Sequence, residues 1–310
     1  MSKEAQLQWE ARWARPAAAA AFVAAVGLLG QIVLYQAVLE DRPRVQALPD
    51  FLLSVDPNPS LYLSSAVVQA IGGLLLLPVF LYLFRAILGR EPAVPRWFVY
   101  LIYLGPVLFA LSAVLGAVDR IDLAQQFADG SYSFPNADPS DSPNLRLCPA
   151  IRGDLGDACA DELLGDNPNG FVFGLSFAGS LAVAFLFVML PLRARRVGLL
   201  SPFMSILGVV AGALLVLQLV PLVPVVIQAF WLVAVGALYL GNWPGGRGPA
   251  WESGESEPWP SAAEKRGLTQ PAQQEEPSEP EREPAPVPEG DAEPERERPA
   301  SRKRRRKPRS

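Results

Sequence analysis

The chain has 310 residues, of which half are apolar, 31 are acidic, 27 are basic and none is histidine. The lack of histidine removes the commonest general base and the commonest zinc ligand, which argues against triad catalysis and metal-dependent hydrolysis. The net charge of −4 says little about partners, because apolar stretches dominate the first 243 positions while proline and charged residues dominate the rest. Arginine outnumbers lysine 23 to 4, which is typical of a bacterium with a GC-rich genome.

Six apolar stretches are long enough to cross a bilayer. At 1.5 Å per residue, about 20 residues cover a hydrocarbon core of roughly 30 Å. The stretches lack the alternation of barrel strands, and lipid tolerates only helices or closed barrels. The sequence therefore predicts an all-α polytopic membrane protein, a six-transmembrane-helix bundle over 17–243 with a disordered C-terminal tail over 244–310. The expected helices cover about 17–39, 61–84, 97–118, 171–192, 201–220 and 222–241.

Residues 1–16 are predicted to form a cytoplasmic N-terminal segment. Trp9 and Trp13 lie four residues apart, on one face of a helix if one forms there. A short helix along the membrane interface and a frayed polar terminus are both compatible with this pattern. The first apolar stretch is too long for the core of a signal peptide and lacks a cleavage site, so we expect it to remain as an anchor.

Lysine and arginine beside the spans predict the orientation. Ten of them fall on one side and five on the other, so the positive-inside rule puts both termini in the cytoplasm and the protein in a bacterial plasma (inner) membrane. The first side carries Lys3, Arg12, Arg15, Arg85, Arg90, Arg96, Arg193, Arg195, Arg196 and Arg247, and the second carries Arg42, Arg44, Arg120, Arg146 and Arg152.

An external loop is predicted over 119–170, with ten acidic residues, three arginines and many turn-forming residues. It holds both cysteines of the chain, Cys148 and Cys159. On the oxidising side of the membrane we expect them to form a disulfide bond, which would contribute roughly 3 kcal/mol by closing this short loop.

Residues 199–240 contain no charged residue and are about twice as long as one span requires. Pro221 and Pro224 predict the turn between two helices of a tight hairpin, since proline removes a backbone donor. A re-entrant arrangement is the alternative.

Small residues at four-residue spacing predict close helix packing. Contacts inside one bundle are favoured over dimerisation for these positions, which are Gly208, Gly212, Gly174 and Ala178.

Uncharged polar residues also occur within the expected spans, and we interpret them mainly as interhelical hydrogen-bonding groups, with a substrate path as the alternative. They are Gln31, Gln36, Ser64, Ser65, Gln69, Ser112, Ser176, Ser180, Gln218 and Gln228.

The cytoplasmic tail over 244–310 is predicted to be disordered, and it ends in a cluster of basic residues. We expect this cluster to contact anionic lipid of the inner leaflet, with a solubilising tail without a partner as the alternative; a nucleic-acid partner is not expected. The lipid-contacting residues are Arg302, Lys303, Arg304, Arg305, Arg306, Lys307 and Arg309.

No catalytic, cofactor-binding or metal-binding motif is found in the sequence. The sequence therefore favours a non-enzymatic accessory or interaction component with a protein partner in the membrane. A transporter or permease for a small neutral or lipid-like solute is the main alternative, and a lipid-modifying enzyme using Asp119, Asp122 and the cytoplasmic arginines is a third. A polar path exposing Gln69, Gln218 or Gln228 would favour transport, whereas a solid core would favour the accessory role.

Overall fold

A computed structural model describes residues 2–39, 48–129, 160, 169–217, 222–244 and 246–259, and within these ranges the regular structure is helical. The two cysteines, Gln218, Pro221 and the basic residues at the end of the tail lie outside the described residues. The helices are α1 (Lys3–Val38), α2 (Leu48–Val55), α3 (Pro59–Arg90), α4 (Phe98–Asp129), α6 (Gly170–Arg196), α7 (Pro202–Leu217), α8 (Leu222–Leu240) and α9 (Pro249–Ser253).

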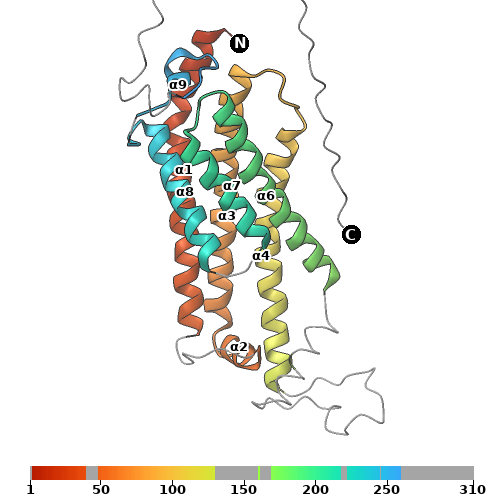
Figure 1. Ribbon diagram of the computed structural model, residues 1–310. Helices are drawn as coiled ribbons and strands as arrows, with labels where there is room; N and C mark the ends of the chain where they lie inside the picture. Colours follow the sequence, from red (N-terminus) through yellow and green to blue (C-terminus); the bar gives the residue numbers. More distant parts are fainter. Residues whose placement is uncertain are drawn as a thin grey trace, which may run out of the picture. The chain divides into compact units, whose positions relative to one another are not determined.

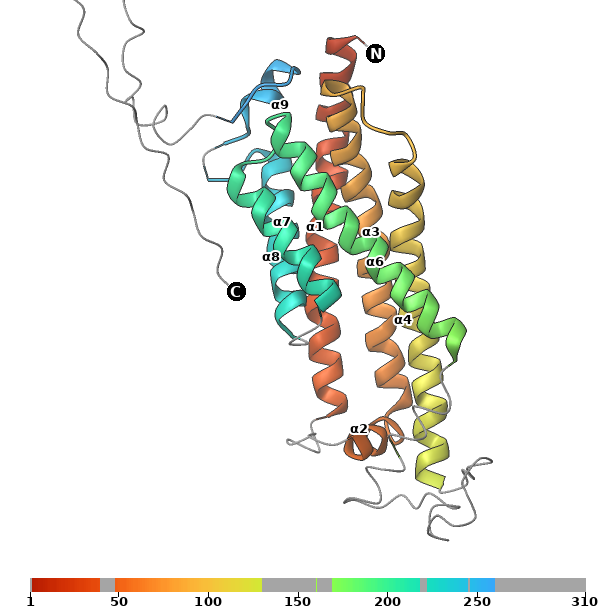
Figure 2. The ribbon, with the colours of Figure 1, turned by 45° about the vertical axis from the view of Figure 1, so that its right-hand side comes forward.

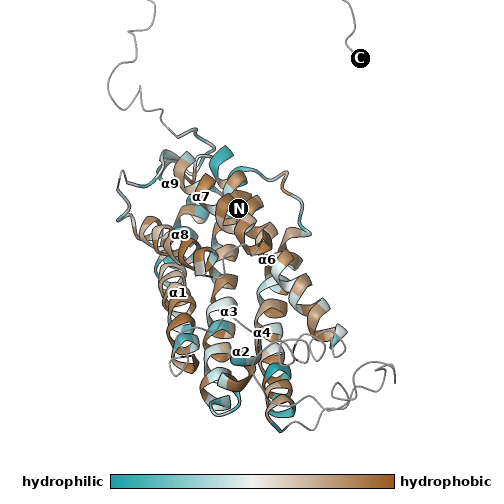
Figure 3. Ribbon diagram, turned by 60° about the horizontal axis from the view of Figure 1, so that its bottom comes forward, coloured by the Kyte–Doolittle hydropathy of each residue, from teal (hydrophilic) through white to brown (hydrophobic). Residues whose placement is uncertain are grey.

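Five of these helices, α1, α3, α4, α6 and α8, are long and apolar enough to cross a membrane, and α7 is a shorter apolar helix of 16 residues. Hydrophobic residues run along the helices in Figure 3, and hydrophilic residues gather near their ends. The predicted class, an all-helical polytopic membrane protein in contact with lipid, is therefore confirmed.

The bundle has two ends that differ in structure (Figure 1). The terminal end holds the N-terminus and α9, together with the last turns of α3, α6 and α8. The loop end holds α2, the last turn of α1 and α4, and the first turn of α6. The short helix α2 lies across the loop end and was not predicted. Its Leu52 and Val55 are fully buried, because they pack into an apolar cluster with Leu123 and Phe127 of α4.

The four longest helices extend past the limits expected from hydropathy alone. α1 starts at Lys3 rather than near residue 17, so the segment 1–16 is neither a separate interfacial helix nor a frayed terminus. The first turns of α1 are helical because they pack against α3. Trp9 stacks on Tyr82 with ring centroids 5.6 Å apart, and Glu10 is buried beside Arg90.

The terminal half of the bundle is packed with aromatic side chains. Phe80, Phe187 and Trp231 are fully buried, and the rings of Phe80 and Trp231 each lie 5.1 Å from that of Phe187. Trp231 donates its indole N–H to the Met204 carbonyl at 3.0 Å, and the Tyr239 hydroxyl donates to the Val79 carbonyl at 3.2 Å. Each buried polar tip therefore has a partner, as a water-free interior requires.

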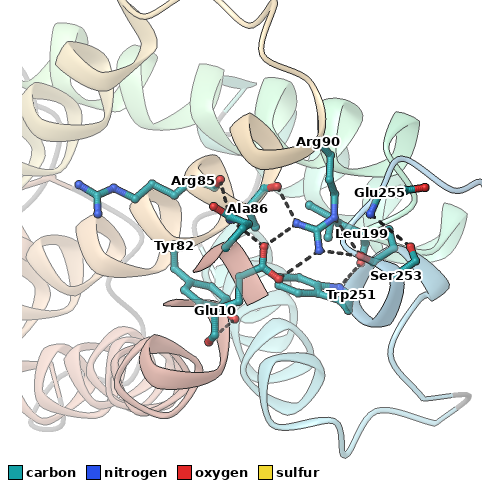
Figure 4. Close-up of polar contacts among 11 residues, drawn as sticks. Glu10, Tyr82, Arg85, Ala86, Arg90, Leu199, Trp251, Ser253 and Glu255 are labelled. Atoms are coloured by element: carbon teal, nitrogen blue, oxygen red, sulfur yellow. Dashed lines mark hydrogen bonds and ion pairs between the residues drawn. The ribbon is translucent and has the colours of Figure 1, made fainter. Parts of the chain in front are cut away.

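Residues 246–259, which the sequence assigns to the tail, pack against the terminal end; we call this segment the strap. Trp251 is buried, donates to the Leu199 carbonyl at 2.9 Å and stacks on Tyr82 with centroids 5.8 Å apart (Figure 4). Arg90 donates to the Ala250 carbonyl at 2.6 Å. The predicted start of the tail at 244 is therefore too early, because a large aromatic side chain and a buried acceptor hold this segment in place.

Candidate ligand-binding cavity

The loop half of the bundle encloses a cavity of about 650 Å³, a volume within the usual range of small-molecule sites. Side chains of α1, α3, α4, α6, α7 and α8 line it. The cavity exists because two of the six bundle helices stop early: α7 and α8 end short of the level that α1 and α4 reach (Figure 2). Their end residues Leu214, Leu215, Pro224 and Val225 form one wall of the cavity.

The cavity extends far along the bundle axis. Its lining includes Leu28, which lies ten residues before the end of α1 at Val38, or about 15 Å at the rise of an α-helix. That depth is roughly half the thickness of a hydrocarbon core. Gln69, Phe109 and Ser112 lie along the same lining.

Amide side chains supply much of the polarity of this cavity. Gln31 of α1, Gln69 of α3 and Gln228 of α8 line it from three helices. Gln228 is 5% exposed, and its Nε2 has no hydrogen-bond partner among the described residues; the same holds for the buried Oε1 of Gln31. A buried polar group without a partner costs about 1–3 kcal/mol, so these two atoms mark energetically costly positions in the wall of the cavity.

Serine side chains add hydroxyl groups to the lining. Ser65 and Ser112 each donate to a carbonyl three residues earlier in their own helix, at 2.7 and 2.9 Å. Their hydroxyl oxygens keep acceptor capacity toward the cavity. These two serines therefore do not form the interhelical hydrogen bonds expected from the sequence.

Charged and aromatic groups gather at the rim. Arg120 of α4 donates to the Tyr62 hydroxyl at 3.3 Å, and Asn169 donates to the Asp119 carboxylate at 3.5 Å. The Tyr62 ring lies 5.9 Å from that of Phe51 on α2, so α2 fixes the position of the tyrosine.

A second hollow of about 330 Å³ lies between α6 and α7. Five residues line both this hollow and the cavity, namely Arg120, Phe173, Ser176, Ser180 and Leu215. The hollow also contains Phe177 and Val216, which are 60% and 48% exposed on the outside of the bundle. We call this hollow the side opening.

The four predicted packing residues have two different environments. A Cβ atom on Gly212 would lie 2.6 Å from the Ala184 carbonyl, and one on Gly208 would lie 2.6 Å from the Pro191 ring, so α7 crosses α6 closely at both glycines. Gly174 and Ala178 are exposed, and a Cβ on Gly174 would meet nothing within 4 Å.

From the sequence, Gln31, Gln69, Gln228 and the serines are expected within the spans, whereas Arg120 is expected in the external loop. The structure continues α4 to Asp129, which makes Arg120 part of the same helix as the cavity-lining Ser112 and Gly116. The signal was present in the sequence, since these three residues lie four apart on one helix face.

The chemistry of this lining suits binding. Within the described ranges no three carboxylate or thiol side chains gather to hold a metal ion.

No protein-family model, no curated protein and no solved structure matches this chain.

Proposed function

We propose that this protein is a carrier for a small neutral or lipid-like solute, which binds in the cavity of the loop half. The observation that carries the proposal is the amide-lined space around Gln69 and Gln228, at a depth where transporters hold their substrates. In an apolar membrane, polar side chains around a space this large are costly unless something occupies it.

The asymmetry of the bundle supports a carrier. The terminal half is filled by Phe80, Phe187 and Trp231 and covered by the strap, while the loop half is hollow. Access from one side at a time is what a carrier requires in each of its states. The accessory role favoured by the sequence stays a prediction, because the described surface identifies no protein partner.

The proposal includes an orientation. It keeps six spans with α7 as the short one, a bacterial plasma membrane, both termini in the cytoplasm, and therefore a cavity open to the outside. A non-enzymatic role, a disulfide between Cys148 and Cys159 and contact of the basic tail with anionic lipid are parts of the same proposal.

Thiol labelling of the full-length protein tests this function. In a background with both native cysteines changed to serine, Gln69→Cys should react rapidly in intact cells with a membrane-impermeant methanethiosulfonate, because water reaches the cavity from outside. Val67→Cys is the matched control: it lies two residues away, is 40% exposed and does not line the cavity, so lipid should keep its thiol protonated and unreactive. Ser205→Cys, buried in the terminal half, should stay unlabelled as well.

The labelling pattern separates the two parts of the proposal. Reaction of Gln69→Cys only in inside-out vesicles would overturn the orientation and keep the cavity. Equal, slow reaction of Gln69→Cys and Val67→Cys in both preparations would contradict a water-accessible binding site.

A further inference from the structure

We infer that the cavity receives the anionic, hydroxyl-bearing phosphate headgroup of a membrane lipid, which enters sideways between α6 and α7 while its acyl chains stay in the bilayer. This inference rests on the proposed function and names the substrate class. Four observations carry it: the side opening, the cation at its inner end, the charge around that cation and the polarity of the interior.

The side opening lies between α6 and α7. The two helices touch at Gly212, where α7 approaches the backbone of α6. Below that contact, Phe177, Leu181 and Val216 line the gap and are 60%, 47% and 48% exposed. Apolar residues of this kind suit acyl chains, and a gap that faces the membrane lets a lipid approach without leaving it.

Arg120 lies at the inner end of this gap and lines both the side opening and the cavity. Ser176 and Ser180 line both spaces as well, so a guanidinium and two hydroxyl groups lie at the boundary between them. A guanidinium can bind two phosphate oxygens at once, which makes it the side chain best suited to a phosphate ester.

The charge near Arg120 is not balanced by an ion pair in the described part of the chain. Its hydrogen bond there goes to the neutral Tyr62 hydroxyl at 3.3 Å, while the neighbouring Asp119 accepts from Asn169. Arg120 is exposed, so its guanidinium is accessible to an anionic oxygen of the ligand and can form a charge-assisted contact with it.

The interior beyond Arg120 is polar, which decides the direction in which a lipid would lie. Gln31, Gln69 and Gln228 line it together with Ser65 and Ser112. Acyl chains cannot form hydrogen bonds with such side chains, whereas the hydroxyl groups of a headgroup both donate and accept. The headgroup therefore belongs inside and the chains outside.

Lipid binding to the purified full-length protein in detergent tests this assignment, with native mass spectrometry to count bound lipids. Phosphatidylglycerol, which carries phosphate and hydroxyl groups, should bind more tightly than phosphatidylcholine. Arg120→Gln should weaken phosphatidylglycerol binding about tenfold or more, because a charge-assisted contact to the phosphate is lost. Arg120→Lys should retain most of the preference.

Two controls keep the test specific. Arg96→Gln removes an exposed arginine that lines neither space, and it should bind phosphatidylglycerol like the parent protein. Every variant keeps the basic tail, so lipid bound there contributes equally to all of them. A further variant, Ser180→Phe, places a bulky ring between the side opening and the cavity. It should reduce the amount of bound phosphatidylglycerol while Arg120 is unchanged.

The outcomes are distinct. Equal binding of the two lipids, or parent-like binding by Arg120→Gln, would overturn the inference. Soluble glycerol 1-phosphate binding as tightly as the lipid would assign the site to a free solute and would also overturn sideways entry. If Gln69→Cys is labelled from water while no lipid binds, the carrier proposal stands and only the lipid assignment fails.

Discussion

At the scale of single residues, the buried ion pair between Glu10 and Arg90 joins α1, α3 and the strap. The side chains of Arg90 and Glu10 are 0% and 5% exposed, and two N–H groups of the guanidinium contact the carboxylate at 2.5 and 3.0 Å. Gln6 donates to the same carboxylate at 2.9 Å. Removing one member of such a pair leaves a buried charge without a counter-charge.

Arg90→Met is therefore expected to destabilise the protein by about 3–5 kcal/mol, seen as a lower unfolding temperature of the purified protein. Adding Glu10→Gln to the same chain should restore much of the loss, because no uncompensated charge remains. Lys3→Met is the control: the Lys3–Glu255 pair is half to three-quarters exposed, so unfolding should not change measurably. Equal unfolding temperatures for Arg90→Met and Lys3→Met would contradict this account.

At the scale of helices, the crossing of α6 and α7 depends on a missing side chain. Gly212 brings α7 so close that its Cβ would lie 2.6 Å from a backbone carbonyl and 2.8 Å from Val188 Cγ2. Backbone cannot move aside as a flexible side chain can, so an added methyl group must push the two helices apart. The side opening begins just beyond this crossing.

Gly212→Ala should thus lower stability by about 1–3 kcal/mol, despite the better helix propensity of alanine. Gly174→Ala is a matched control from the same sequence pattern; with nothing within 4 Å, it should leave stability unchanged or slightly higher. Thermal unfolding of both variants in one detergent decides the matter. A loss for Gly174→Ala as large as for Gly212→Ala would mean that the glycines act through another partner.

At the scale of the whole molecule, the strap closes the terminal end of the bundle. It passes over the turn between α6 and α7 at Gly198, where φ is +77° and a Cβ would collide with the Glu257 carbonyl. The ring of Trp251, which belongs to the strap, faces the guanidinium groups of Arg90 and Arg247 at 5.4 and 5.8 Å. Glycine is needed at 198 for both the left-handed backbone and the close approach.

A chain ending at Pro260 should accordingly unfold at the same temperature as the full-length protein. A chain ending at Gly248 should unfold at a clearly lower temperature, since losing a buried tryptophan costs about 3–5 kcal/mol and Arg90 also loses its acceptor. Differential scanning calorimetry of the three chains measures this. Identical transitions for the two shortened chains would show that the strap contributes nothing to the bundle.

Much of the architecture could be predicted from the sequence, because hydropathy reports what a lipid environment demands of each segment. Long apolar stretches indicated the membrane helices, and the limits of α8 were placed within one residue of those observed, Leu222 and Leu240. The limits of α1 and α3 were not, since their polar turns are stabilised by contacts such as Trp9 with Tyr82. Hydropathy cannot register a partner that lies on another helix.

The sequence by itself determined that the protein is helical, membrane-bound and carries glutamine and serine within its spans. Only the tertiary structure decided what those residues do. Whether Gln31 and Gln228 bond to each other's helices or line a cavity depends on how far α7 and α8 extend beside the longer helices. Likewise, Arg120 becomes a candidate ligand contact because α4 continues past the apolar stretch and the side opening lies beside it. Distances between helices are set by packing across the whole bundle, which no local pattern of residues encodes.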